Sequence, residues 1–191
     1  SHTYCKDLMN LIKNNQKKYD EISTLINNKN FDRAEKELIS ILKKDSKNFK
    51  FHYLLGILYG FTKKFEKAET HFKKVISLNS NDIKALYNLG VILKNNGKID
   101  EAYTKFKKAL EIEPKYIEAI LGIGKICDEK KNYSEAKKYY EESLALDKDH
   151  KLANQLYGRL LMKLNEMGKG QYYNYKSSGV IRFTEKQFEI I

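Results

Sequence analysis

The chain has 191 residues, 41% hydrophobic and 32% charged, which is enough apolar material for a packed core and excludes wholesale disorder. One proline and ten glycines exclude collagen-like and proline-rich chains. The net charge of +11 comes from 36 Lys and Arg against 25 Asp and Glu, but only Arg33, Arg159 and Arg182 are arginines. Because base readers rely on arginine and stacked aromatics, this lysine excess weighs against a dedicated nucleic-acid role.

Cysteine and histidine usage gives no sign of a metal or a cofactor. Cys5 and Cys127 are far apart in the sequence, and the four histidines are scattered along it. No apolar run is long enough to insert into a membrane, and the first residues lack the apolar core of an export signal. The sequence therefore predicts a cytoplasmic protein with no cofactor, although one Asn132-Tyr133-Ser134 sequon is present.

The first element in chain order is a helix within residues 1–14. Tyr4, Leu8, Leu11 and Ile12 fall on one face of that helix. We interpret this segment as a capping helix or as the remnant of an earlier repeat.

From residue 15 onward the sequence repeats itself with a fixed period of about 34 residues. Three columns keep this period, one of glycine, one of alanine and one of large apolar residues. The columns are Gly56, Gly90, Gly124 and Gly158; Ala34, Ala68, Ala102 and Ala136; and Leu38, Phe72, Phe106 and Tyr140. Each period predicts two amphipathic helices joined by a short polar turn, with small residues where the helices cross. Pro114 falls between two units, where a missing N–H is tolerated.

These columns resemble the tetratricopeptide repeat family, whose pattern is W-x2-L-G-x2-Y followed by A-x3-F and P. His52-x2-Leu55-Gly56-x2-Tyr59 with Ala68-x3-Phe72 is one copy, and Leu89-Gly90 with Ala102-x3-Phe106 and Pro114 is another. The resemblance implies an all-α fold, a right-handed α-α solenoid of about four repeats. The repeat domain is expected over 15–166, with units at 15–48, 49–82, 83–116 and 117–150 and a terminal helix at 151–166 that has no partner helix. Residues 15–48 are a degenerate copy, because Glu21 and Ile22 replace the Leu-Gly pair.

A C-terminal tail is expected over 167–191. Its tyrosines, in Gln171-Tyr172-Tyr173-Asn174-Tyr175, could cover the last helices, lie in the groove or stay disordered. Residues 180–183 alternate as a short strand does, and Thr184-Glu185-Lys186-Gln187 has the spacing of a capping box that would begin a helix.

The resemblance also implies a function, namely binding of a peptide or protein segment in the concave groove lined by the first helix of each repeat. The residues that would line this groove are Lys50, Tyr53, Leu54, Ile57, Lys84, Tyr87, Asn88, Val91, Leu121, Lys125 and Arg159. Their composition suits a ligand with apolar anchors and acidic flanks.

One subgroup of the family holds the C-terminal carboxylate of heat-shock chaperones with a set of Lys, Asn and Arg side chains. At the equivalent positions this chain has Tyr53, Ile57, Asn88, Glu118 and Gly122, of which only Asn88 agrees. In the register one repeat earlier, Lys84 alone agrees. We therefore predict that chaperone tails are not the ligand.

Other classes of function were weighed against this binding scaffold. No glycine-rich phosphate loop, HExxH or GxSxG motif occurs, so we predict that the chain is not an enzyme. Alternatives are a scaffold or fragment of a larger enzyme-containing protein, a homo-oligomer formed through residues 151–191, and a basic binder of nucleic acid or anionic surfaces.

Overall fold

The computed structural model describes the backbone of residues 2–179, 181–184 and 187–190, and the side chains of residues 12–179. This part of the chain forms ten helices followed by a β-hairpin. The chain divides into two compact units, which we call unit 1 (Ser1–Lys98) and unit 2 (Ile99–Ile191).

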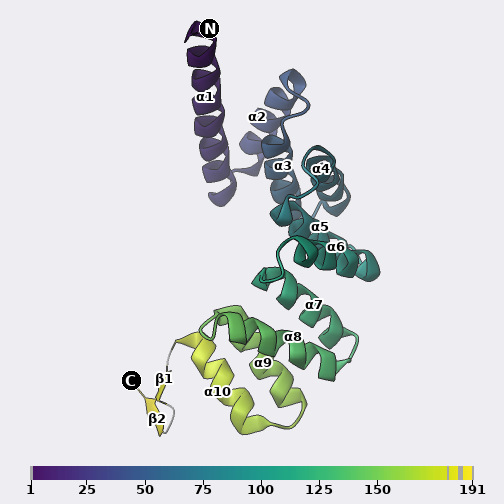
Figure 1. Ribbon diagram of the computed structural model, residues 1–191, viewed down its shortest axis with the longest axis vertical. Helices are drawn as coiled ribbons and strands as arrows, with labels where there is room; N and C mark the ends of the chain where they lie inside the picture. The colour runs from purple at the N-terminus through teal and green to yellow at the C-terminus, as the bar shows by residue number, and fades with distance from the viewer. Residues whose placement is uncertain (1, 180, 185–186, 191) are drawn as a thin grey trace. The chain divides into compact units, whose positions relative to one another are not determined.

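Unit 1 is a series of antiparallel helices (Figure 1). The helices are α1 (His2–Asn27), α2 (Phe31–Lys44), α3 (Phe49–Phe61), α4 (Phe65–Leu78) and α5 (Ile83–Asn95). Each packs against its neighbour in sequence, and α3 also contacts both α1 and α5. The expected helix at 1–14 and the first helix of the repeat at 15–48 are one continuous helix, α1. Side chains before Ile12 lie outside the described residues, and Ile12 itself is exposed.

Unit 2 continues the same hairpin pattern. Its helices are α6 (Ile99–Ile112), α7 (Ile117–Glu129), α8 (Tyr133–Leu146), α9 (Lys151–Lys163) and α10 (Met167–Ser178). Consecutive helices pack against each other, and α7 also contacts α9. Figure 1 shows α9 and α10 lying side by side as a hairpin.

Helix α10 corrects the expectation that the helix of 151–166 lacks a partner. Gly170 and Asn174 stand one repeat period after Ala136 and Tyr140, so they continue two of the repeat columns with atypical residues. A Cβ built on Gly158 would lie 2.8 Å from the carbonyl oxygen of Gly170, which shows that the two backbones cross almost in contact. The tyrosine-rich part of the expected tail is therefore the second helix of a fifth hairpin, and it covers α9.

The end of the chain is a hairpin of two strands, β1 (Ile181–Thr184) and β2 (Gln187–Ile190). They pair antiparallel, with Ile181 opposite Ile190 and Thr184 opposite Gln187. Of the strand expected at 180–183, residues 181–183 lie in β1 and residue 180 lies outside the described residues. The capping-box expectation is wrong, because Gln187 begins a strand and not the first turn of a helix.

One turn geometry follows the first helix of every repeat. The residue with positive φ in each turn recurs at the repeat period: Lys29, Lys63, Gly97, Lys131 and Asn165, with φ between 57° and 80°. The residue that follows it donates its N–H to a carbonyl five residues earlier, as Lys64 does to Tyr59 and Glu166 to Leu161. This is the bonding of a left-handed helix C-cap. The first and last repeats, which are poor matches in sequence, thus share the backbone of the central ones.

Close packing inside the α3–α4 and α7–α8 hairpins depends on the glycine column. A Cβ built on Gly56 would lie 2.8 Å from the ring of Phe72, and one on Gly124 would lie 2.6 Å from Tyr140. Both aromatic residues are fully buried. Among the described residues, no helix is both long enough and apolar enough to span a bilayer.

Candidate functional site

Equivalent positions on α1, α3 and α5 form one face of unit 1. One column along this face is Gln16, Lys50 and Lys84, and another is Tyr19, Tyr53 and Tyr87, each spaced by one repeat period. The Nζ atom of Lys50 lies 3.5 Å from Oε1 of Gln16. Residues one repeat apart in sequence are therefore neighbours in space on this face.

The first of two cavities on this face has a volume of about 270 Å³. It is lined by Gln16, Tyr19, Phe49, Lys50, Tyr53, Asp82 and Lys84. These residues come from α1, from the start of α3 and from the start of α5. We call it the lysine cavity, because two lysines from successive repeats contribute to it.

The two lysines of this cavity form no ion pair within the described part of the chain. The one carboxylate that lines it, Asp82, accepts a hydrogen bond from the backbone N–H of Ala85 at 2.9 Å and caps α5. The lysine cavity is thus electropositive. By contrast, Lys73 and Lys98 elsewhere in unit 1 share the buried carboxylate of Glu69.

The hydroxyl groups of the tyrosines stay protonated near neutral pH. Burial, together with the charges of Tyr19 and Asp82, raises the pKa of Tyr53 to about 12. Burial likewise raises the pKa of Tyr19. Both hydroxyls can therefore donate hydrogen bonds.

The second cavity, of about 290 Å³, lies between α3 and α5. It is lined by Gly56, Ile57, Gly60, Phe61, Phe72, Asn88, Val91, Ile92 and Asn95. None of these residues is charged, and all but Asn88 and Asn95 are apolar residues or glycine. The Phe61 side chain at its edge is 63% exposed. We call it the apolar cavity.

A hydrogen bond connects a residue of the first cavity with a residue of the second. Nδ2 of Asn88 donates to the hydroxyl oxygen of Tyr53 at 2.8 Å and also to the carbonyl oxygen of Lys84 at 2.9 Å. Both amide hydrogens of Asn88 are then engaged, while its Oδ1 accepts no hydrogen bond from the described residues. The bridge therefore offers one free acceptor and one hydroxyl donor, which match the two polar groups of a peptide backbone.

The predicted lining residues are divided between the two units. In unit 1, Lys50, Tyr53 and Lys84 line the lysine cavity, and Ile57, Asn88 and Val91 line the apolar cavity. Leu54 is buried in the core, and Tyr87 is half-buried on α5. In unit 2, Leu121 is buried on α7, Lys125 is half-buried on the same helix, and Arg159 is exposed on α9. The structure thus brings together six of the predicted residues within unit 1.

Gln16 and Tyr19, the two residues of α1 that line the lysine cavity, are among the lining residues absent from the sequence prediction. They were missed because residues 15–48 lack the Leu-Gly pair and the lining positions were counted from that glycine. The spacing contained the signal, since Gln16 and Tyr19 stand one repeat period before Lys50 and Tyr53. Counting back one period from Lys50 and from Tyr53, instead of counting from the glycine column, would have identified them.

Sequence comparison identifies the repeat. Profiles of the tetratricopeptide repeat match residues 49–82, 83–116 and 117–150, which together make up more than half of the chain. The chain belongs to the tetratricopeptide repeat family. No curated protein sequence matches this one.

Solved structures of other tetratricopeptide repeat folds are similar in architecture. PilW, titled a widely conserved type IV pilus biogenesis factor, is 22% identical with a TM-score of 0.77, over 87% of this chain and 79% of PilW. PilF of Pseudomonas aeruginosa is 20% identical with a TM-score of 0.75, over 84% of this chain and 73% of PilF. YrrB, described as having an unusual peptide-binding site, is 19% identical with a TM-score of 0.62, over 83% of this chain and 81% of YrrB. At these identities the similarity establishes the fold, an all-α repeat solenoid.

Membership of this family makes the chain a protein-protein interaction scaffold. Tetratricopeptide repeats present an extended surface built from successive helical hairpins, and they use that surface to bind other proteins.

Proposed function

We propose that unit 1 binds an extended peptide or protein segment on the face formed by α1, α3 and α5. The single observation that supports this most strongly is the pair of cavities joined by the Tyr53–Asn88 hydrogen bond. An apolar hollow beside a polar one, with a backbone-matching donor and acceptor between them, provides anchoring and orientation together.

The repeat columns favour the first three repeats as the binding segment. The tyrosine column of α1, α3 and α5 is followed by Leu121 in α7 and Gln155 in α9. The column of Gln16, Lys50 and Lys84 is followed by Glu118. Both the aromatic and the basic character of the face therefore end with α5.

The test compares binding by the intact chain and by a variant with Tyr53→Ala and Tyr87→Ala. The probe is a labelled peptide selected from a displayed random library against the unmodified chain. We expect the variant to lose binding while its far-ultraviolet circular dichroism stays that of a helical protein. A matched control carries Tyr172→Ala and Tyr175→Ala in α10 and should bind as the unmodified chain does. Equal binding by the α3/α5 variant would overturn the assignment of the face.

The cytoplasmic location and self-association through residues 151–191 stay predictions. The absence of the chaperone-clamp residues supports a different class of ligand for this face.

A further inference from the structure

We infer that the ligand of unit 1 is a polypeptide segment in which an acidic side chain stands near an apolar one. The acidic side chain would lie in the lysine cavity and the apolar one in the apolar cavity. This inference rests on the proposed function and specifies the chemistry of the ligand.

Charge distribution is the first argument. Unit 1 holds 19 of the 36 Lys and Arg residues against 10 of the 25 Asp and Glu residues, a net charge of +9, and unit 2 therefore carries only +2. Within unit 1, Lys50 and Lys84 line a cavity and have no carboxylate partner among the described residues. A carboxylate from a ligand would form ion pairs with both ammonium groups.

The start of α3 adds to this positive potential. Helix α3 has no acidic residue in its first turn, and the side chain of its N-cap residue, Asn48, does not cap it. That side chain instead donates to Asp45 at 3.0 Å. The first N–H groups of α3, at Phe49 and Lys50, thus present the positive end of the helix dipole beside the two lysines.

The neighbouring cavity has the opposite character. Its lining residues carry no charge, and Phe72 and Ile92 line it together with Gly56 and Gly60 of α3. Phe61 is 63% exposed at its edge, although it stacks on Phe31 with ring centroids 6.3 Å apart. An aliphatic or aromatic side chain of a ligand would remove this apolar surface from water.

The uncharged cavity favours a peptide over a polyanion as the ligand. A nucleic acid carries a phosphate at every residue, so it would need basic groups along the whole face. The lysine cavity supplies two of them and the lining of the apolar cavity supplies none, so a polyanion crossing to the apolar cavity would lose hydration there without compensation. The two cavities together therefore favour a polypeptide of mixed character.

The experiment uses the full chain and fluorescein-labelled synthetic peptides on a Gly-Ser background. One aspartate and one leucine are moved apart one residue at a time, and binding is measured by fluorescence anisotropy. At the best spacing we expect replacing Asp by Asn, or Leu by Ser, to weaken binding by about tenfold. The Asp-dependent part should shrink as salt is raised.

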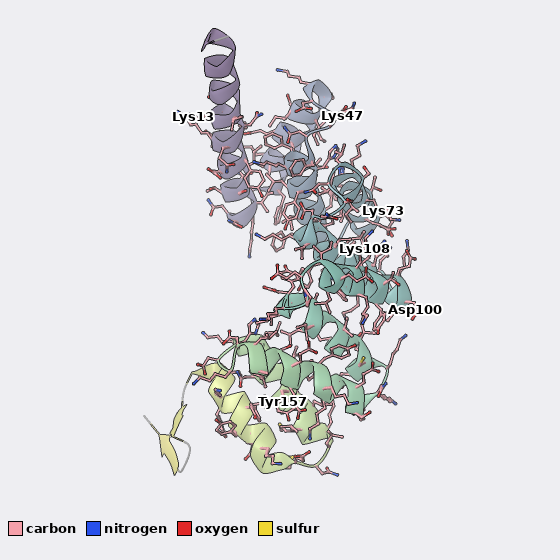
Figure 2. The ribbon with its side chains drawn as sticks, viewed as in Figure 1. Lys13, Lys47, Lys73, Asp100, Lys108 and Tyr157 are labelled. Carbon is pink, nitrogen blue, oxygen red and sulfur yellow. The ribbon has the colours of Figure 1, made fainter. Side chains whose placement is uncertain are left out.

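Charge exchange identifies the site. The variant K50E/K84E should no longer bind the peptide with Asp, and it should bind a peptide that has Lys in place of that Asp. The variant K13E/K47E is the matched control, because it changes the net charge equally at exposed lysines of unit 1 outside both cavities (Figure 2). It should leave the preference for Asp unchanged. Loss of that preference in the control would overturn the inference.

Failure of this inference differs from failure of the proposed function. If Asn and Asp peptides bind equally, and K50E/K84E binds both as the unmodified chain does, the acidic-apolar ligand is wrong while the face still binds peptides. If neither these peptides nor library-selected ones bind the face, the proposed function is wrong as well.

Discussion

The ring of Phe72 occupies the space that a side chain at Gly56 would need. A Cβ built on Gly56 would lie 2.8 Å from two ring atoms of Phe72, closer than carbon atoms approach in folded proteins. The α3–α4 hairpin therefore favours glycine at this position, because a side chain there would overlap the fully buried ring.

Three glycines separate the effect of space from that of backbone conformation. We expect Gly56→Ala to lower the free energy of unfolding by about 1–3 kcal/mol through overpacking. Gly97→Ala should cost about 1 kcal/mol, because Gly97 has φ of 80° although no atom lies within 4 Å of its added Cβ. Gly168→Ala, which has neither constraint, should be neutral or stabilising. Urea unfolding measures all three, and equal effects would contradict this interpretation.

The bridge between the two cavities predicts a measurable coupling. Tyr53→Phe and Asn88→Ala each remove the 2.8 Å hydrogen bond between α3 and α5. Because the second substitution has no bond left to break, the double variant should be less destabilised than the sum by about 1 kcal/mol. A urea double-mutant cycle gives this number. Strict additivity would show that the bond contributes nothing to the fold of unit 1.

A pair of histidines makes the stability of unit 1 depend on pH. Nδ1 of His52 lies 2.9 Å from Nδ1 of His71, and Nε2 of His52 lies 3.0 Å from the carbonyl oxygen of Ser46. Because that carbonyl only accepts, Nε2 of His52 carries a proton, and neutral His52 must accept from His71 at Nδ1. Burial, together with the charges of His52 and Lys67, lowers the pKa of His71 to about 4.

The sign of the pH effect follows from this lowered pKa. As the pH falls from about 6.5 toward 4, the unfolded chain takes up a proton at His71 before the folded chain does. The free energy of unfolding should therefore fall across this window, by about 1–2 kcal/mol after allowance for partial solvent exposure. Urea unfolding at several pH values measures it. The His71→Gln variant should lose most of the slope, and an unchanged slope would assign it to other groups.

The central repeats were predictable because their spacing and their packing have the same cause. Gly56 and Phe72 meet at one helix crossing and Ala68 is buried on the same helix as Phe72, so the columns that identified the repeats also supply the packing that forms them. Leu54 was predicted on the face but is buried, because position counting alone cannot separate the face from the adjoining core.

The fifth hairpin was missed because substitutions concealed it. Gly170 and Asn174 occupy the alanine and aromatic columns, and both are poor helix formers. In the structure, the close crossing of Gly158 and Gly170 replaces the aromatic packing, and Asn174 donates from Nδ2 to the sulfur of Met162 at 3.1 Å. Contacts between backbones leave little pattern in a sequence, whereas the turn residue Asn165 still keeps the repeat period.

The most direct test of peptide binding by unit 1 is a nuclear magnetic resonance titration of the ¹⁵N-labelled full chain with the library-selected peptide. We predict saturable chemical-shift changes at the backbone amides of Gln16, Tyr19, Tyr53 and Asn88, while the amides of α8 to α10 stay unchanged. Changes confined to unit 2 would contradict the claim that the face formed by α1, α3 and α5 is the binding surface.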